Sequence, residues 1–181
     1  PEGPFENVDY YQTVATGYFE TMGIPIVVGR GFTDTDASPS NPVTVVNETM
    51  VRTFWKDQNP IGQRVRPGGP NTPWVTVIGV AKDVKQGGLD KKTGTEIYFL
   101  VDQTANLPGG GQAPTTMNIV LRTTMPPSAL TTAVESAVRE ADRSVPVVRL
   151  RDMNAVFDES IRRPRLLAQL RLSIAGQHEV S

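Results

Sequence analysis

The sequence has no cysteine, a single histidine and almost no net charge. Its 181 residues include one histidine, His178, and 18 basic side chains against 19 acidic ones, for a formal net charge of −1. The absence of cysteine excludes disulfide frameworks, thiolate metal sites and cysteine nucleophiles, and one histidine cannot form a histidine metal cluster. A near-neutral balance gives no electrostatic reason to expect nucleic acid or an anionic membrane as partner.

Long hydrophobic runs are also missing. A transmembrane helix needs about 20 mostly apolar residues, whereas the densest apolar runs here, 24–28 and 75–81, have the length of strands. The first residues show neither the charged nor the apolar region of a signal peptide. The chain begins with Pro1 rather than methionine, so we interpret it as an excised piece and expect any membrane role to lie outside this piece.

Glycine and proline are frequent, with 16 and 15 copies, which indicates many turns and short elements. We expect helices at 16–23, with Thr16 as cap and Gly23 as stop, then at 47–55, at 126–141 and from Asp152 onward. The expected strands are 8–14, 24–28, 43–46, 63–66, 74–80, 96–101, 117–122 and 146–150. The predicted fold class is therefore α+β, with a βαβ unit at 117–150.

Two loop motifs could bind a ligand but fail the full pattern. Residues 29–32 read Gly-Arg-Gly-Phe. A dinucleotide site needs a third glycine three residues later, opening a helix, so we interpret this stretch as a plain turn. Asp34 and Asp36 could contact a cation, but the further oxygen ligands and closing glutamate of a calcium loop are missing. We interpret this stretch as a solvated loop.

Catalytic groups are also hard to assemble. Ser160 has no base beside it, and carboxylate pairs such as Asp152 with Asp158, or Asp158 with Glu159, could act as acid and base only inside a cleft. Helical spacing instead places Asp158 and Glu159 on the polar side of the last helix. No catalytic, cofactor-binding or metal-ligating residue is predicted.

The remaining candidates concern surfaces. We interpret Trp55 and Trp74 as packing residues rather than a platform for a sugar or base. The weak basic patch has no interleaved aromatic residues, which speaks against nucleic acid; it comprises Lys82, Lys85, Lys91 and Lys92. The Arg162–Arg165 cluster precedes an apolar stretch, 166–176. It fits either an amphipathic terminal helix or a basic junction before a membrane helix.

The order and spacing of several segments carry a family resemblance. They begin with VATGYFETMGIP at 14–25 and GRGFT at 29–33, and continue with VVNETM, FW and NPIGQRV between 45 and 65. WVTVIGVAKDVK at 74–85 and EIYF at 96–99 follow, and the match extends through 117–150 to Met153 and Arg162–Arg165. Over about residues 8–165 the chain resembles the extracytoplasmic region of ABC-transporter permeases of the MacB/FtsX-like class.

The resemblance implies a position between the first and second membrane helices of a four-helix permease. It implies a porter-like lobe of βαβ units, at 7–44 and 115–160, and an inserted smaller α+β lobe at 45–114. Residues 161–181 would be a juxtamembrane segment or a cut tail. Members of the class have a further helix and strand before Pro1, so we expect an incomplete porter-like sheet with an exposed edge that invites pairing between chains. We place hinges at the lobe junctions, 44–46 and 112–116.

The implied function is non-catalytic. Such a domain lies on the periplasmic side of the bacterial inner membrane and couples ATP-driven motion to export, extraction or partner regulation. Expected partners are the parent transmembrane helices, a cytoplasmic ATPase domain or subunit, a periplasmic adaptor or substrate protein, and a second permease. The alternative is a domain that captures a lipid, peptide or drug between its lobes, and a hydrolase using Asp34, Asp36 or Asp158 would need a cleft of clustered carboxylates.

Overall fold

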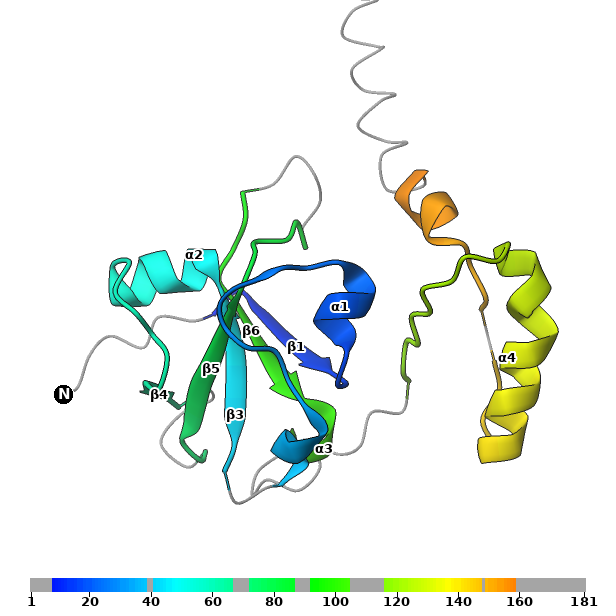
Figure 1. Cartoon of the computed structure of the whole chain (residues 1–181), viewed down its shortest axis with the longest axis horizontal. Coiled ribbons are helices and arrows are strands. Elements are labelled where there is room, and N and C mark those ends of the chain that lie inside the picture. The colour runs from blue at the N-terminus through cyan, green and yellow to red at the C-terminus, as the bar shows by residue number, and fades with distance from the viewer. Residues whose placement is uncertain are drawn as a thin grey trace, which may run out of the picture. The chain divides into compact units, whose positions relative to one another are not determined.

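A mixed sheet organises the first hundred residues (Figure 1). The computed structural model describes residues 8–38, 41–66, 72–86, 92–104, 116–147 and 149–158. Its six strands are β1 (Tyr10–Val14), β2 (Ile26–Gly29), β3 (Val43–Asn47), β4 (Arg64–Val65), β5 (Val75–Ala81) and β6 (Glu96–Leu100). The α+β class and these six predicted strands are confirmed, each within a few residues of its expected limits.

The strand order is β1-β6-β3-β5-β2, and β4 pairs with the start of β5. β3 runs parallel to β5 and antiparallel to β6, while β1 is parallel to β6 and β2 is antiparallel to β5. All five residues of the central strand β3 are buried. Its nearly continuous apolar sequence, VTVVN, is typical of a strand that is covered on both faces.

Helix α1 (Tyr18–Met22) lies between two glycines in the left-handed conformation, Gly17 with φ 78° and Gly23 with φ 69°. The predicted stop at Gly23 is confirmed, because glycine adopts this conformation without steric cost. The predicted cap at Thr16 is wrong: Gly17 occupies the cap position, and no side chain there accepts a hydrogen bond.

A second helical segment, α2 (Glu48–Met50), continues into the π-helical turn η2 (Val51–Trp55). Asn47 caps it: the Asn47 side chain accepts a hydrogen bond of 2.9 Å from the Met50 backbone N–H. This bond satisfies one of the N–H groups that a helix leaves free in its first turn.

Two short helical segments fall where the sequence predicted a loop or the end of a strand. They are η1 (Asp34–Ala37) and α3 (Val101–Thr104), which directly follows β6.

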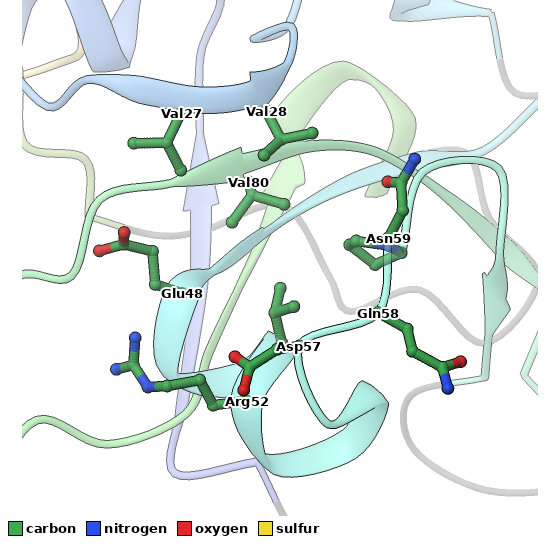
Figure 2. A pocket seen from close by; sticks show the side chains of 10 residues that line it. Val27, Val28, Glu48, Arg52, Asp57, Gln58, Asn59 and Val80 are labelled. Atoms are coloured by element: carbon green, nitrogen blue, oxygen red, sulfur yellow. The ribbon is translucent and has the colours of Figure 1, made fainter.

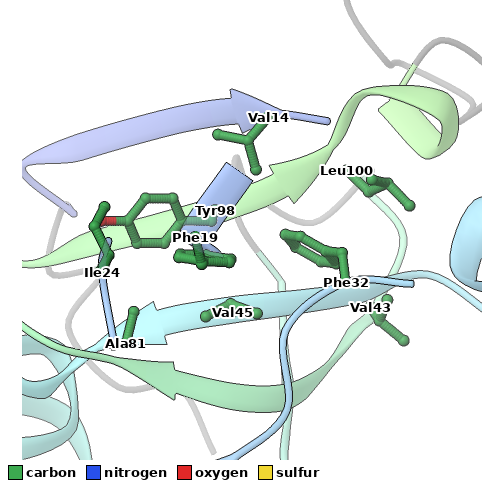
Figure 3. Packing of buried hydrophobic residues seen from close by; sticks show 9 residues of the cluster. All are labelled: Val14, Phe19, Ile24, Phe32, Val43, Val45, Ala81, Tyr98 and Leu100. Atoms are coloured by element: carbon green, nitrogen blue, oxygen red, sulfur yellow. The ribbon is translucent and has the colours of Figure 1, made fainter. Parts of the chain in front are cut away.

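Two hydrophobic clusters cover the two sides of the sheet. Figure 3 shows the first, in which Phe19 from α1 packs edge-on against Tyr98, with their ring centroids 5.0 Å apart. The second gathers around Val46 and Ile97, beneath α2 and η2. Because successive residues of a strand point to opposite faces, Ile97 and Tyr98 serve different clusters. The sheet is thus packed from both sides.

The chain divides into two compact units, which among the described residues comprise 8–121, the sheet unit, and 122–158, the helical unit. β1 and β2 belong to the predicted flank 7–44, yet they pair with β6 and β5 of the predicted insert. Strands from both sides of the boundary at 44–45 thus join one sheet, and the division into two lobes there stays a prediction. The assignment of 115–160 to a porter-like lobe stays a prediction.

The helical unit contains α4 (Pro127–Ala141), which starts at the predicted proline pair. The predicted turn after Asp152 is also present, over residues 153–158. The strands expected at 117–122 and 146–150 are not formed in the described residues. Met117, Ile119 and Leu121 alternate as in a strand, but their side chains are exposed. A strand forms only where a neighbouring strand completes its backbone hydrogen bonds. None of the described helices is long and apolar enough to cross a membrane.

Candidate functional site

The Gly-Arg-Gly motif lies where β2 and β5 approach most closely. Gly29 is paired with Gly79 across the two strands. A Cβ atom on Gly79 would overlap the carbonyl oxygen of Arg30, and one on Gly29 would overlap the carbonyl oxygen of Ile78. At Gly31 a Cβ would meet only ordinary contacts, at 3.6 Å or more. The first glycine of the motif therefore serves backbone packing, which agrees with the prediction of a turn rather than a nucleotide loop.

Asp36 is a buried structural residue, so the prediction of a solvated loop is wrong at this position. Arg30 donates to both carboxylate oxygens of Asp36, at 2.6 and 2.8 Å. The backbone N–H and the hydroxyl of Thr33 also donate to Asp36 Oδ2, at 2.8 and 2.9 Å. Asp34 is exposed as predicted. Among the described residues no group of three or more acidic or histidine side chains could hold a metal ion.

The ion pair makes the stability of the sheet unit depend on pH. Hydrogen bonding from Arg30 lowers the pKa of Asp36 to about 2, outweighing its partial burial. A lowered pKa stabilises the fold above the ordinary pKa of about 3.9, and this contribution disappears as the pH falls toward 2. Arg30 is half exposed, so solvent screening keeps the contribution modest.

We therefore expect Asp36→Asn to lower the free energy of unfolding at pH 7 by about 1–2 kcal/mol. The variant should also lose less stability than the parent sequence between pH 4 and pH 2. Urea unfolding at pH 7, 4 and 2.5 measures both effects. Asp34→Asn, two residues away and exposed, is the matched control and should leave both quantities unchanged. Equal pH dependence of the two variants would contradict this role of Asp36.

Gln103 is a buried amide that the sequence reasoning missed. Its side-chain oxygen accepts from the Val43 backbone N–H at 3.0 Å. Its Nε2 donates to the carbonyl oxygens of Ser38 and Asn41, each at 3.1 Å, and to that of Asp36. The amide thus ties the chain between η1 and β3 to the helix that follows β6. Its sequence context, between Asp102 and Thr104 just after an apolar strand, does not distinguish it from an ordinary surface residue.

Glu96 and Tyr98 form a buried polar pair on the same side of β6, with 1% and 0% exposure. Gln86 donates to Glu96 Oε1 at 2.7 Å. The other carboxylate oxygen and the Tyr98 hydroxyl have no hydrogen-bond partner of good geometry. Burial raises the pKa of both groups, and the nearby carboxylate raises that of Tyr98 further. Neither residue lines the grooves described below, so the pair has no visible access to a substrate.

The other predicted candidates do not come together as a site. Asp158 is exposed, and Asp152 accepts a hydrogen bond of 2.8 Å from the Asn154 N–H in the turn that it caps. Glu159 and Ser160 lie outside the described residues, as do Lys91 and the Arg162–Arg165 cluster with 166–176. Carboxylates on an exposed turn do not supply the cleft that acid–base catalysis needs.

The two tryptophans have different roles. Trp55 packs against the second hydrophobic cluster, as predicted. Trp74 is 46% exposed, so its prediction as a packing residue is wrong. Its neighbour Val75 is the residue that points into the core, because side chains alternate along β5.

Of the basic patch, Lys82 lies 3.4 Å from Glu48, and Lys85 and Lys92 are exposed. The described part of this patch is therefore exposed to solvent, and the expectation that it does not bind nucleic acid stays a prediction.

A groove of about 310 Å³ lies beside β2 (Figure 2). Val27, Val28 and Val80 form its apolar part, and Glu48 and Arg52 from the helical segment of α2 and η2 carry its charge. The remaining lining residues are Val51, Asp57, Gln58, Asn59 and Pro60. Its volume is at the lower end for ligand pockets, so it could hold a side chain or a small apolar group.

Two of the charged side chains that line this groove are paired, Arg52 with Asp83 and Glu48 with Lys82. Arg52 lies 2.6 Å from Asp83, which also accepts from the backbone N–H and hydroxyl of Thr49 at 2.9 and 2.8 Å. Burial alone would raise the pKa of Asp83, but these hydrogen bonds outweigh it and lower the pKa. The groove therefore combines an apolar wall with these ion pairs and with the carboxylate of Asp57.

A second hollow, of about 360 Å³, is more polar. Its lining runs along the start of β1 and the residues before β6, and includes Asp9, Lys92, Thr49 and Thr53. Asp9 accepts from the Thr95 backbone N–H and hydroxyl, at 2.7 and 2.9 Å, which fixes this edge of the sheet. Both hollows are lined by the sheet unit alone.

Comparison with known proteins identifies one family. The family model described as MacB-like periplasmic core domain matches residues 4–141. Over 76 residues the chain is 33% identical to the macrolide export ATP-binding/permease protein MacB of Aggregatibacter actinomycetemcomitans. That match covers 40% of this chain and 11% of the relative.

One solved structure supports the fold, and a second is reported with it. The periplasmic region of MacB from Actinobacillus actinomycetemcomitans matches with a TM-score of 0.55 at 19% identity, covering 72% of this chain and 56% of that one. The extracellular domain of the noncanonic ABC-type transporter YknZ from Gram-positive bacteria matches with a TM-score of 0.40 at 22% identity, covering 52% of this chain and 44% of that one. The chain thus spans little more than half of the first structure.

Proposed function

Because the chain belongs to the family of MacB-like periplasmic core domains, we propose that it couples ATP-driven motion of an ABC transporter permease to events outside the membrane. Membership places the domain on the periplasmic side of the inner membrane. The proposed role is non-catalytic: the domain relays motion toward export, extraction or regulation of a partner. The proposed partners are the parent membrane helices, a cytoplasmic ATPase, a second permease and a periplasmic adaptor or substrate protein.

One observation carries this proposal: the chain forms two compact units, and the sheet of the first is packed on both faces. Close-packed interiors resist deformation, so the sheet unit should move as one body, with its motion relative to the helical unit concentrated at the connection between them. The hinge predicted at Thr44–Val46 is wrong, because these residues are buried and lie between β5 and β6. Residues 112–115 lie outside the described part, and the units divide at Leu121–Arg122. We place the hinge there.

A flexible insertion at the hinge tests the proposal. We expect six residues, Gly-Gly-Ser-Gly-Gly-Ser, placed between Leu121 and Arg122 of the full permease to lower transport at least tenfold. ATP hydrolysis should persist, because the ATPase is untouched while the connection that carries motion becomes slack. The same insertion within residues 67–71, which belong to the sheet unit, is the control. If the permease with the hinge insertion transports at the parent rate, the proposal is contradicted.

The alternative function, capture of a lipid, peptide or drug between lobes, calls for a larger concave site. Ligand pockets usually reach several hundred Å³ and bury most of the ligand. The two hollows of about 310 and 360 Å³ are at the lower end of that range, and each is lined within one unit. They support contact with a partner side chain more than enclosure of a whole ligand.

A further inference from the structure

The outer side of the β4–β5 ribbon carries two arginines and an exposed tryptophan. Val65 pairs with Val75 and Arg64 with Thr76. Val75 is buried, and successive residues of a strand point to opposite faces. Arg64, Arg66 and Trp74 are each one position away from the Val65–Val75 pair, so they face outward. Trp74, just before β5, keeps 46% of its surface exposed.

Both guanidinium groups stack on the Trp74 ring. The Arg66 Cζ atom lies 4.5 Å from the ring centroid, and the Arg64 Cζ atom lies 5.7 Å from it. Stacking holds a guanidinium in place through cation–π attraction while its N–H edges remain able to donate. Among the described residues Arg64 forms no ion pair. The arrangement is therefore a pre-ordered positive platform with an apolar centre.

We propose that this platform, formed by Arg64, Arg66 and Trp74, binds an acidic segment of a partner protein. A guanidinium donates two parallel hydrogen bonds to a carboxylate, so two neighbouring arginines fit a pair of Asp or Glu side chains. The exposed indole adds apolar contact, and Trp and Arg are the residues that most often dominate protein interfaces.

The charge pattern favours a protein segment over a membrane. Basic segments that bind anionic lipid usually contain about four to eight lysines or arginines, whereas this platform contains two arginines. The whole chain carries a net charge of −1, so it offers no wider field that would draw it to an anionic bilayer. This inference does not depend on transmitted motion, because it concerns binding by the domain itself.

Binding of a labelled peptide tests the platform. The probe is fluorescein-labelled hexaglutamate, titrated with the 181-residue chain at low ionic strength and followed by fluorescence anisotropy. We expect saturable binding that hexaglutamine does not show and that 0.5 M salt abolishes. The double variant Arg64→Gln/Arg66→Gln should weaken binding at least tenfold. Arg139→Gln/Arg143→Gln, which removes two exposed arginines of the helical unit, should change it less than twofold.

A third variant separates a positioned platform from simple charge. Trp74→Leu removes no charge but releases both guanidinium groups, and we expect it to weaken binding at least threefold. Thermal unfolding followed by circular dichroism confirms that each variant is folded. Equal affinity of the Arg64→Gln/Arg66→Gln variant and its control would overturn the proposal. Binding to phosphatidylglycerol vesicles without binding to hexaglutamate would also overturn it.

Discussion

Replacing Gly79 with alanine is expected to lower the free energy of unfolding of the sheet unit by about 3 kcal/mol or more. The added methyl would overlap the Arg30 carbonyl oxygen, and the strands β2 and β5 would have to move apart. The overlapping atoms belong to the Arg30 backbone, so no flexible side chain could move aside to relieve the overlap. Since domains of this size are stable by only about 5–15 kcal/mol, such a loss removes a large share of the total. Urea unfolding followed by circular dichroism measures it.

Gly31→Ala is the matched control for this prediction. Gly31 lies two residues after the end of β2, close to the Arg30 carbonyl that Gly79 faces. A Cβ atom on Gly31 would lie 3.6 Å from the nearest side-chain atoms of Glu20 and Phe19. We expect a change within about 1 kcal/mol, with either sign, because the substitution also restricts the unfolded chain. Similar losses of unfolding free energy in the two variants would contradict the claim that Gly79 is needed for the close approach of β2 and β5.

The second large effect is expected at Gln103. Gln103→Leu keeps the volume of the side chain but removes every hydrogen bond that it makes with the chain between η1 and β3. The Val43 backbone N–H would be left buried and unsatisfied, together with carbonyl oxygens that now accept from the amide. We expect a loss of about 2–4 kcal/mol, because each buried polar group without a partner costs about 1–3 kcal/mol. Thermal and urea unfolding report this loss.

The matched control is Gln63→Leu, which replaces an exposed glutamine of the same unit. Exposed substitutions usually change stability by no more than about 0.5 kcal/mol. Hydrogen exchange adds a local readout: the Val43 amide should lose protection in Gln103→Leu and keep it in Gln63→Leu. Full protection of Val43 in Gln103→Leu would contradict the proposed role of the amide.

The strands of the sheet unit could be predicted because their sequences carry simple patterns. β3 is a short apolar run, and in β5 the side chains alternate between the two faces of the sheet. Asn47 is a residue type typical of a helix N-cap, and a helix follows β3 there. Pairing could not be predicted in the same way. The parallel contact of β3 with β5 joins segments about 30 residues apart, and nothing local to either strand specifies that neighbour.

Several side-chain roles depend on such distant contacts. Asp36 reads as a loop residue until Arg30 is seen beside it, and Gln103 acquires its function from a segment more than 60 residues earlier. Trp74 was misjudged because its size suggested burial, whereas the alternation of β5 directs Val75 inward instead. In each case composition favoured one environment and tertiary position decided another.

The described residues from 116 onward show the converse. Residues 117–121 and 146–150 have the apolar character of strands, and α4 has the predicted period, but a strand is formed only when another strand completes it. Met117, Ile119 and Leu121 are exposed, as are Val145, Val147 and Leu150. Both segments are apolar, but the predicted strands are wrong, because neither segment forms a strand in the described residues.

The central claim is that the two units move relative to each other while the sheet unit stays rigid. The chain has no cysteine, so pairs of cysteines can be introduced as spin-label sites into a permease otherwise freed of them. The pair Thr13→Cys/Glu135→Cys spans the two units, and Thr13→Cys/Gln63→Cys lies within the sheet unit. Pulsed electron paramagnetic resonance then measures both distances in the nucleotide-free and ATP-bound permease. The account predicts that the first distance changes and the second does not; an unchanged first distance in a permease that still transports would contradict it.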